Sequence, residues 1–208
     1  INCLKERLCE SGQRLAFDPP SPEQATIGGA IAANAVGPLR SAFGGIRDLI
    51  IGMSIVLADG SLVKSGGQVV KNVQGFDLHR LQVGALGTLG ILVDVSFKLA
   101  PIPAKERTIV VLFEDLDSVF DACQQIICRS FEPEGLAVLT GESVPPLISF
   151  MDQPDRDSNA PYMLLVKLAG GLASIQRQTD LVTGAAGATS AKATSVLDNY
   201  GDASRFWK

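Results

Sequence analysis

Short apolar stretches interrupted by glycine and proline run through residues 1–103. Apolar residues at helical spacing predict a helix over residues 2–11, which Gly12 would end. Residues 18–22 contain three prolines and predict a rigid, extended connector. Small residues over 30–35 then predict a short helix that packs very closely against its neighbours.

A strand pattern follows in the same half of the chain. Residues 50–57 and 62–64 predict two strands joined by the turn Asp59-Gly60. Asp77 is a candidate N-cap for a helix that reaches about Val83. Residues 91–99 predict a half-buried strand, whose expected core face comprises Ile91, Val93, Val95, Phe97 and Leu99. Pro101-Ile102-Pro103 marks the expected domain boundary.

Residues 104–208 alternate strand and helix patterns. The expected order is strand 108–113, helix 115–129, strand 136–139, strand 162–168, helix 173–183 and strand 191–196. This β-α-β-β-α-β order predicts a ferredoxin-like domain. The first helix would bury Val119, Ala122, Cys123, Ile126 and Ile127. Residues 153–161 predict an exposed loop, and a last helix is expected to begin near Asp198.

Composition excludes several classes of protein. The chain is 46% hydrophobic and 19% charged, which is typical of a globular protein rather than a disordered one. A net charge of −4 without a Lys/Arg cluster argues against nucleic-acid binding. No apolar run is long enough to predict a transmembrane segment.

The four cysteines do not form a recognisable motif. Cys3, Cys9, Cys123 and Cys128 lack CxxC spacing and a nearby histidine cluster. We therefore expect no metal site and no disulfide framework, but buried, reduced thiols in a cytosolic protein. These cysteines could not hold an iron–sulfur cluster.

Glycine is concentrated in one region: 13 of the 21 glycines fall between Ala25 and Ile91. This density suggests that backbone approaches a long, flat, phosphate-bearing ligand. Gly84, Gly87 and Gly90 have the spacing GxxGxxG between a predicted helix and strand, which disfavours a dinucleotide fingerprint, and no Walker loop or GxSxG elbow is present. The single histidine, His79, is interpreted as a surface or helix-packing residue rather than a catalytic one.

The glycine-rich region resembles, in order and spacing, the second part of the FAD-binding domain of the vanillyl-alcohol-oxidase type flavoproteins. The matching segments are Ala25-Thr26-Ile27-Gly28-Gly29, Ala33-Asn34, Phe43-Gly44-Gly45-Ile46-Arg47-Asp48, Lys71-Asn72-Val73-Gln74-Gly75-Phe76-Asp77-Leu78 and Gly87-Thr88-Leu89-Gly90-Ile91. Gly37-Pro38-Leu39-Arg40 and Lys71-Asn72-Val73 most resemble the FAD-binding subunits of bacterial glycolate oxidases. Leu86 and Phe76 depart from the family, which often has Glu and Tyr there.

This resemblance implies an α+β fold. Residues 1–103 would be the second subdomain of a PCMH-type FAD-binding domain without its N-terminal subdomain. Residues 104–208 would be a ferredoxin-like cap domain, truncated at its C-terminus. Because the family's phosphate-binding loop lies in the missing subdomain, we expect this chain alone to bind FAD weakly.

The cofactor would be FAD, and the resemblance places its ligands in the glycine-rich segments. The expected FAD-binding residues are Thr26, Ile27, Gly28, Gly29, Asn34, Gly44, Arg47, Asp48, Gly87, Thr88, Gly90 and Ile91. Gly28 and Gly29 before a helix would offer amides to the pyrophosphate or ribityl chain. Gly44, Gly45, Arg47 and Asp48 would order the loop beneath the flavin. No catalytic base is identified.

The implied activity is oxidation of a small 2-hydroxy acid such as glycolate, by hydride transfer to the flavin. Two alternatives stay open: a self-contained D-lactate or D-2-hydroxyglutarate dehydrogenase, and a non-catalytic FAD-binding scaffold or electron-transfer subunit. The expected partners are FAD, the hydroxy acid and other oxidase subunits, including an iron–sulfur protein. The expected location is cytoplasmic, with peripheral membrane association through a complex as an open alternative.

Overall fold

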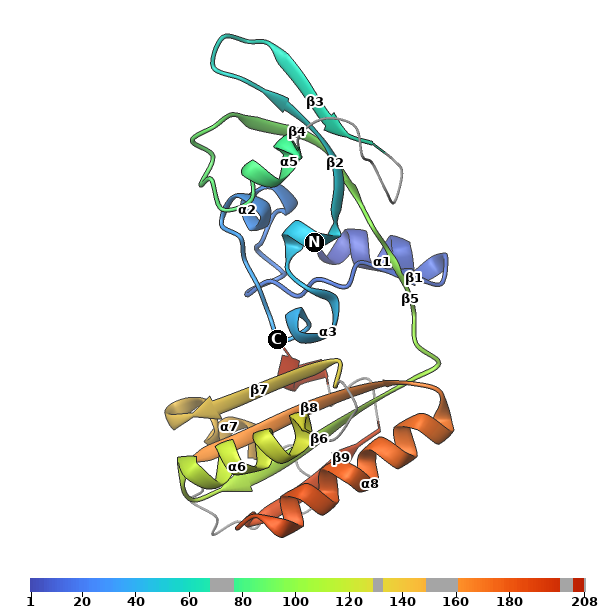
Figure 1. Ribbon diagram of the computed structural model, residues 1–208, viewed down its shortest axis with the longest axis vertical. Coiled ribbons are helices and arrows are strands. Elements are labelled where there is room, and N and C mark those ends of the chain that lie inside the picture. Colours follow the sequence, from blue (N-terminus) through green and yellow to red (C-terminus); the bar gives the residue numbers. More distant parts are fainter. Residues whose placement is uncertain (68–76, 129–132, 149–160, 199–203, 208) are drawn as a thin grey trace. The chain divides into compact units, whose positions relative to one another are not determined.

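The computed structural model describes residues 1–67, 77–128, 133–148, 161–198 and 204–207. The chain divides into two compact units, Ile1–Ile102 and Pro103–Lys208, and each is described by itself (Figure 1). The motif residues Lys71 to Phe76 lie outside the described residues, as does nearly all of the predicted loop 153–161.

A three-stranded antiparallel sheet organises the first unit. Its strands are β2 (Ile50–Val56), β3 (Leu62–Gly66) and β4 (Ile91–Phe97), in the order β3-β2-β4. The predicted hairpin is confirmed: Gly60 has a φ of +82°, and Asp59 accepts a hydrogen bond from the Ser61 amide. Helix α1 (Asn2–Glu10) also forms as expected, and Gly12 follows it with a φ of +68°. A small ladder joins β1 (Gln13–Arg14) to β5 (Ala100–Pro101).

Four short helices belong to this unit. They are α2 (Ile27–Ala32), α3 (Arg40–Phe43), α4 (Ile46–Leu49) and α5 (Leu78–Leu81). Helices α3 and α4 were not predicted, because a single turn of four residues is too short to show helical periodicity. Helices α2 and α4 share a core with the sheet, which comprises Leu15, Phe17, Ala30, Ile31, Ile46, Leu49, Ile50, Met53 and Ile55. Helix α2 begins at Ile27 rather than Ala30, so the glycine pair lies inside its first turn.

The second unit has the predicted ferredoxin-like order. Its elements are β6 (Lys105–Phe113), α6 (Leu116–Ile127), β7 (Gly135–Thr140), α7 (Pro145–Ile148), β8 (Tyr162–Gly170), α8 (Leu172–Ala188) and β9 (Ala193–Leu197). The four strands form an antiparallel sheet in the order β7-β8-β6-β9. Helix α8 continues five residues beyond its predicted end, through Gly184 and Gly187, because Ala185 and Ala186 between them are buried.

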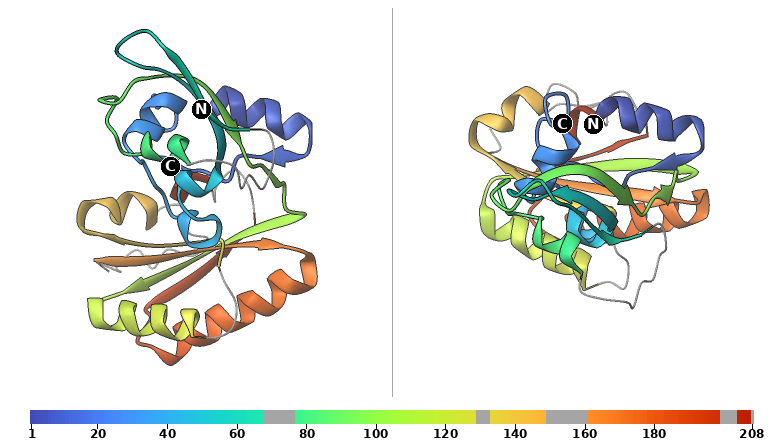
Figure 2. Two further views of the ribbon diagram at one scale, coloured as in Figure 1. Left: turned by 45° about the horizontal axis from the view of Figure 1, so that its top comes forward. Right: turned by 90° about the horizontal axis from the view of Figure 1, so that it is seen from above.

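Side chains on opposite faces of this sheet form two cores. Helices α6 and α8 cover one face, and α7 lies on the other (Figure 2). A 3₁₀ turn at Ser204–Trp207 adds Phe206 and Trp207 to the second core, where the Trp207 indole donates to Thr108 Oγ1 at 2.9 Å. The start of the helix predicted near Asp198 falls on residues 199–203, outside the described residues.

Two expectations about buried residues are wrong. Ile127 is 62% exposed, because the α6 core face is filled by Val119, Ala122, Cys123 and Ile126. Of the cysteines, which are all free, Cys123 is buried and the other three are exposed.

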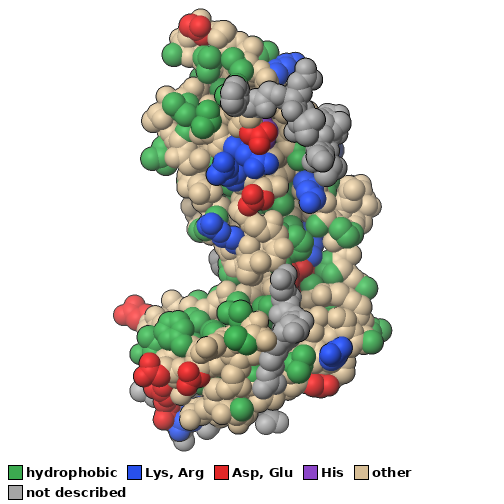
Figure 3. Space-filling model, in the orientation of Figure 1, with side chains coloured by type: hydrophobic (Ala, Val, Ile, Leu, Met, Phe, Trp, Pro, Cys, Tyr) green, Lys and Arg blue, Asp and Glu red, His purple; other side chains and the backbone are tan. Residues whose placement is uncertain are grey.

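Acidic side chains gather on the second unit in Figure 3, in keeping with its 14 Asp and Glu against 9 Lys and Arg over residues 101–208.

Candidate functional site

The first turn of α2 presents backbone amides without side chains in front of them. Thr26 is the N-cap, and its Oγ1 accepts a hydrogen bond from the Gly29 amide at 3.0 Å. The Ile27 and Gly28 amides have no acceptor among the described residues, as is usual for a helix start. A Cβ atom added at Gly28 would meet nothing within 4 Å. This turn therefore offers two amide donors beside open space.

A second group of predicted residues lies against the other end of α2. The Gly84 amide donates to the Ile31 carbonyl at 3.0 Å, and the Leu86 amide donates to the Ala32 carbonyl at 2.9 Å. Asn34 follows α2 with a φ of +48°, and a Cβ at Gly84 would lie 3.5 Å from its Cβ. These contacts bring Asn34 and the turn that contains Gly87 together, although they are 53 positions apart in the sequence.

The turn from Ala85 to Gly90 leads directly into β4. Thr88 donates through both its amide and its hydroxyl to the Ala85 carbonyl, at 3.0 and 2.7 Å. Gly90 has a φ of +152°, and a Cβ there would lie 2.7 Å from Ile55 Cγ2 and 2.8 Å from the Val56 carbonyl oxygen. Only glycine fits this close approach, which fixes where Ile91 enters the sheet.

Ile91 does not face the core as predicted. It is 71% exposed, Val93 is 61% exposed, and Leu92 packs on the core instead. The cause is a β-bulge: Ser54 pairs with Asp94 whereas Ile55 pairs with Leu92, so Val93 is an extra residue. A one-residue slip reverses which side chains face outward. Leu86 and Leu89 are also exposed, so the turn and the start of β4 form an apolar surface that the strand pattern did not reveal.

The remaining predicted residues lie at the end of α3 and on α4. Gly44 ends α3 with a φ of +78°, and the Gly45 amide donates to Asp48 Oδ2 at 2.9 Å. Arg47 and Asp48 are both exposed on α4. Asp48 thus orders the Gly44-Gly45 loop through the Gly45 amide.

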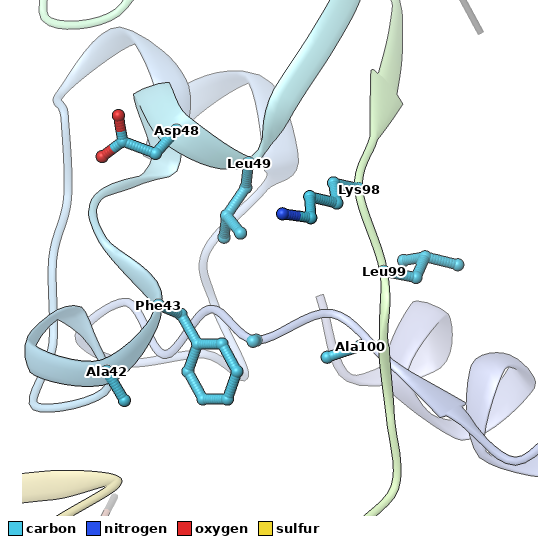
Figure 4. Close-up of a pocket in the computed structure, with 8 residues that line it drawn as sticks. Ala42, Phe43, Asp48, Leu49, Lys98, Leu99 and Ala100 are labelled. Atoms are coloured by element: carbon cyan, nitrogen blue, oxygen red, sulfur yellow. The ribbon is translucent and has the colours of Figure 1, made fainter. Parts of the chain in front are cut away.

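A pocket of about 220 Å³ lies between these two helices and the chain that leaves β4. Its lining comprises Ala16, Ala42, Phe43, Asp48, Leu49, Lys98, Leu99 and Ala100. In Figure 4 the Lys98 side chain points into the pocket toward Leu49, whereas the Asp48 carboxylate turns away from it. Typical ligand sites measure roughly 300–1,000 Å³, so this pocket is too small to enclose a dinucleotide.

His79 is a packing residue. It is 4% exposed, its amide donates to Ser65 Oγ at 3.1 Å, and its Nδ1 lies 3.1 Å from the same oxygen. Burial lowers the pKa of His79 below its ordinary value, so the ring is neutral at pH 7. The helix-packing interpretation is confirmed.

The comparisons with known proteins identify the first unit. Residues 1–66 match the model of a family described as an FAD binding domain. These residues therefore resemble part of an FAD binding domain. The resemblance to vanillyl-alcohol-oxidase type flavoproteins is thereby confirmed, and so is FAD as the cofactor of this domain.

The curated relatives include two glycolate oxidase subunits and a D-lactate dehydrogenase. The chain is 31% identical to glycolate oxidase subunit GlcD of Bacillus subtilis over 176 residues, which cover 79% of this chain and 35% of that protein. It is 42% identical to glycolate oxidase subunit GlcE of Escherichia coli over 101 residues, or 48% and 29% of the two chains. A D-lactate dehydrogenase of Anaerostipes hadrus is 33% identical over 61% of this chain and 27% of its own length. The chain thus spans about a third of the relatives it matches.

Solved structures support the fold. An alkyldihydroxyacetonephosphate synthase superposes with a TM-score of 0.78 over 98% of this chain and 39% of its own, at 20% identity. At that identity the match shows the α+β fold alone. Within the described parts of the chain, no helix is long and apolar enough to cross a membrane, and no cluster of metal-ligating side chains occurs.

The residues of the first unit fit an FAD molecule. The Ile27 and Gly28 amides, beside the open space at Gly28, suit an anionic or hydroxyl-bearing portion. The exposed apolar side chains of Leu86, Leu89 and Ile91 suit a flat aromatic portion. The structure does not test the individual ligands, which stay predictions.

Proposed function

We propose that the protein is the FAD-binding subunit of an oxidoreductase that oxidises glycolate or a similar 2-hydroxy acid, within a complex of several subunits. The similarity to both GlcD and GlcE, two subunits of glycolate oxidase, is the observation that carries this proposal. An iron–sulfur protein among the partner subunits remains part of the proposal.

The bound flavin would supply the chemistry by accepting a hydride from the α-carbon of the substrate. The residues of this chain would bind and orient the flavin. The Ile27 and Gly28 amides would hold its polar chain, and Leu86, Leu89 and Ile91 would exclude water from its rings. Asp48 would keep the Gly44-Gly45 loop in place through its bond to the Gly45 amide.

A self-contained dehydrogenase is the second candidate, because two D-lactate dehydrogenases are 33% and 31% identical to this chain. The non-catalytic FAD-binding scaffold remains the third. Anaerobic addition of glycolate or D-lactate to the purified full-length protein, alone and with its partner subunits, separates the three. Flavin bleaching by the lone protein supports the second candidate, and bleaching only in the complex supports the first. A bound flavin that neither acid bleaches in either preparation supports the scaffold.

The substitution Gly28→Ala tests the proposed FAD site. The added methyl meets no protein atom within 4 Å, and alanine favours a helix. We therefore expect the free energy of unfolding to rise by ~0.5–1 kcal/mol. The methyl would displace the cofactor from one or two amide hydrogen bonds at ~1.5–3 kcal/mol each, raising the Kd for FAD at least tenfold.

The matched control is Gly187→Ala in α8, which also adds a helical methyl where nothing lies within 4 Å. It should leave the FAD affinity of the full-length protein unchanged, as measured by quenching of flavin fluorescence. Equal FAD affinity in the Gly28→Ala protein and the wild type would show that α2 does not bind the cofactor.

A further inference from the structure

Helix α6 in the second unit exposes a row of large apolar side chains. Leu116, Phe120 and Ile127 are 38%, 58% and 62% exposed. At 100° per residue these three positions fall within an arc of about 40°, and they extend for about 16 Å along the helix. They lie beside the buried face of Val119, Ala122, Cys123 and Ile126 rather than in it.

The core of the second unit does not require these three side chains. Four other residues of α6 already fill the space against the sheet. A single exposed apolar residue is ordinary, but an aligned row of large ones marks an interaction surface. Burying such a side chain is worth about 1.5–3 kcal/mol, which a partner could gain by covering it.

Negative charge is concentrated in the part of the sequence that contains this helix. The 35 residues from Glu114 to Ile148 contain seven Asp and Glu against one Arg, whereas the rest of the chain contains 15 against 17 Lys and Arg. The charge of the whole chain is therefore due to this segment.

Two of these acids are free to meet a partner. Glu114 is paired with Lys192 at 2.7 Å, and Asp115 caps α6 through the Ser118 amide at 2.8 Å. Asp117 and Asp121 are exposed on α6 and have no ion-pair partner among the described residues. They lie one turn apart, where like charges destabilise a helix by ~0.2–0.5 kcal/mol. The helix dipole favours Asp117 in the first turn, whereas Asp121, which lies beyond that turn, gains no such stabilisation.

We propose that the α6 surface, which comprises Leu116, Phe120, Ile127, Asp117 and Asp121, binds an amphipathic helix of another protein whose apolar side is flanked by Lys and Arg. The apolar row matches the i, i+3 and i+4 anchors of such a helix, and the two carboxylates match its basic flanks. The inference rests on the proposed function in one respect: the other protein is a partner subunit of the oxidase.

An apolar helix face could also bind a second copy of the chain or a lipid surface, and the charge of the α6 surface argues against both. A second copy of the chain, docked through the same surface, would place Asp117 and Asp121 against their own counterparts. Anionic lipid would meet the same repulsion. A basic partner alone turns both carboxylates into favourable contacts.

Two synthetic peptides provide the test. One is an 18-residue amphipathic helix with leucines on one side and lysines on its flanks, and the other has glutamates in place of the lysines. We expect the full-length protein to bind the lysine peptide in fluorescence anisotropy, more weakly as salt rises, and not to bind the glutamate peptide. Phe120→Ser, and separately Asp117→Lys with Asp121→Lys, should each weaken binding at least tenfold.

Leu172→Ser is the matched control, because Leu172 is 71% exposed on α8 of the same unit but outside the α6 surface. It should leave peptide binding unchanged, and urea unfolding should show that all the variants fold. Equal binding of the lysine peptide by wild type and Phe120→Ser would overturn the proposal. So would a dimer, or binding to anionic phosphatidylglycerol vesicles, that Phe120→Ser abolishes.

Bleaching of the flavin by glycolate, measured on the wild-type protein alone and with its partner subunits, is a separate readout. Wild-type protein that binds the lysine peptide but whose flavin is bleached in neither preparation would contradict the proposed function and leave the docking surface standing.

Discussion

Arg107 on β6 connects three elements on the face of the four-stranded sheet that α6 and α8 cover. Its Nε and Nη2 donate to the two carboxylate oxygens of Asp198, which follows β9. Its Nη1 donates to Thr179 Oγ1 at 2.8 Å and to Gln176 Oε1 at 3.3 Å, both on α8. The Arg107 side chain is only 10% exposed. Replacing it with alanine therefore removes every one of these contacts at once.

The expected loss of stability follows from burial. Hydrogen bonds to a charged group contribute about 1.5–3 kcal/mol each where they are shielded from water. The Asp198 side chain is 49% exposed, so its pair with Arg107 is worth much less than a buried one. Adding the bond to buried Thr179 and the lost packing of the arginine stem, we expect Arg107→Ala to lower the free energy of unfolding by ~2–3 kcal/mol.

The effect should depend on pH. Arg107 and then Lys105 hold the pKa of Asp198 below its ordinary value. Because the pKa is depressed in the folded state, this stabilisation is present above the unfolded pKa of about 4 and is lost as pH falls through the folded pKa. The difference between wild type and Arg107→Ala should therefore shrink in acid.

Urea titration followed by Trp207 fluorescence measures this change. Trp207 is the single tryptophan of the chain, and its indole binds Thr108 beside Arg107. Arg177→Ala, which removes an exposed arginine from α8, is the control and should have little effect. A loss below ~0.5 kcal/mol for Arg107→Ala, equal to that of the control, would refute the reasoning.

Three further predictions address other parts of the molecule. Since burial lowers the pKa of His79, the contribution of His79 to stability should be present above about pH 6.5 and be lost as pH falls through the folded pKa. The urea midpoint of the His79→Gln protein should therefore change less between pH 7.5 and pH 5 than that of the wild type. With Ellman's reagent, Cys3, Cys9 and Cys128 should react quickly in the folded protein, whereas Cys123, whose pKa is raised by burial, should react only after unfolding; four equally fast thiols would contradict this. Gly90→Ala should lower the free energy of unfolding by ~2 kcal/mol or more, because its Cβ would overlap Ile55 and the Val56 carbonyl at positive φ; the similarly positive Gly60, where nothing lies within 4 Å, should tolerate alanine better in the same titration.

Periodicity predicted most of the second unit because strands and helices there are long enough to repeat their pattern. Helix 115–129 and the strands around it formed within a few residues of their expected bounds. The exposure of Ile127 was not predictable from its spacing, since it depends on which side of α6 meets the sheet. The one-turn helices α3 and α4 have no periodic signal, because four residues are too few to repeat a helical pattern.

The candidate site also has some features that the sequence predicted and others that only the structure showed. The sequence alone indicated the cofactor, through motifs that resemble a flavoprotein family in order and spacing. It also determined the Asp59-Gly60 turn, because glycine at positive φ acts within a few residues of itself. Only the tertiary structure decided that the turn at Gly87 lies against α2, through hydrogen bonds from Gly84 and Leu86. It also decided that Ile91 points outward, because the bulge at Val93 arises from pairing with β2. Contacts between segments far apart in the chain, which no local pattern encodes, placed the turn at Gly87 beside the end of α2 and the Ile91 side chain at the surface.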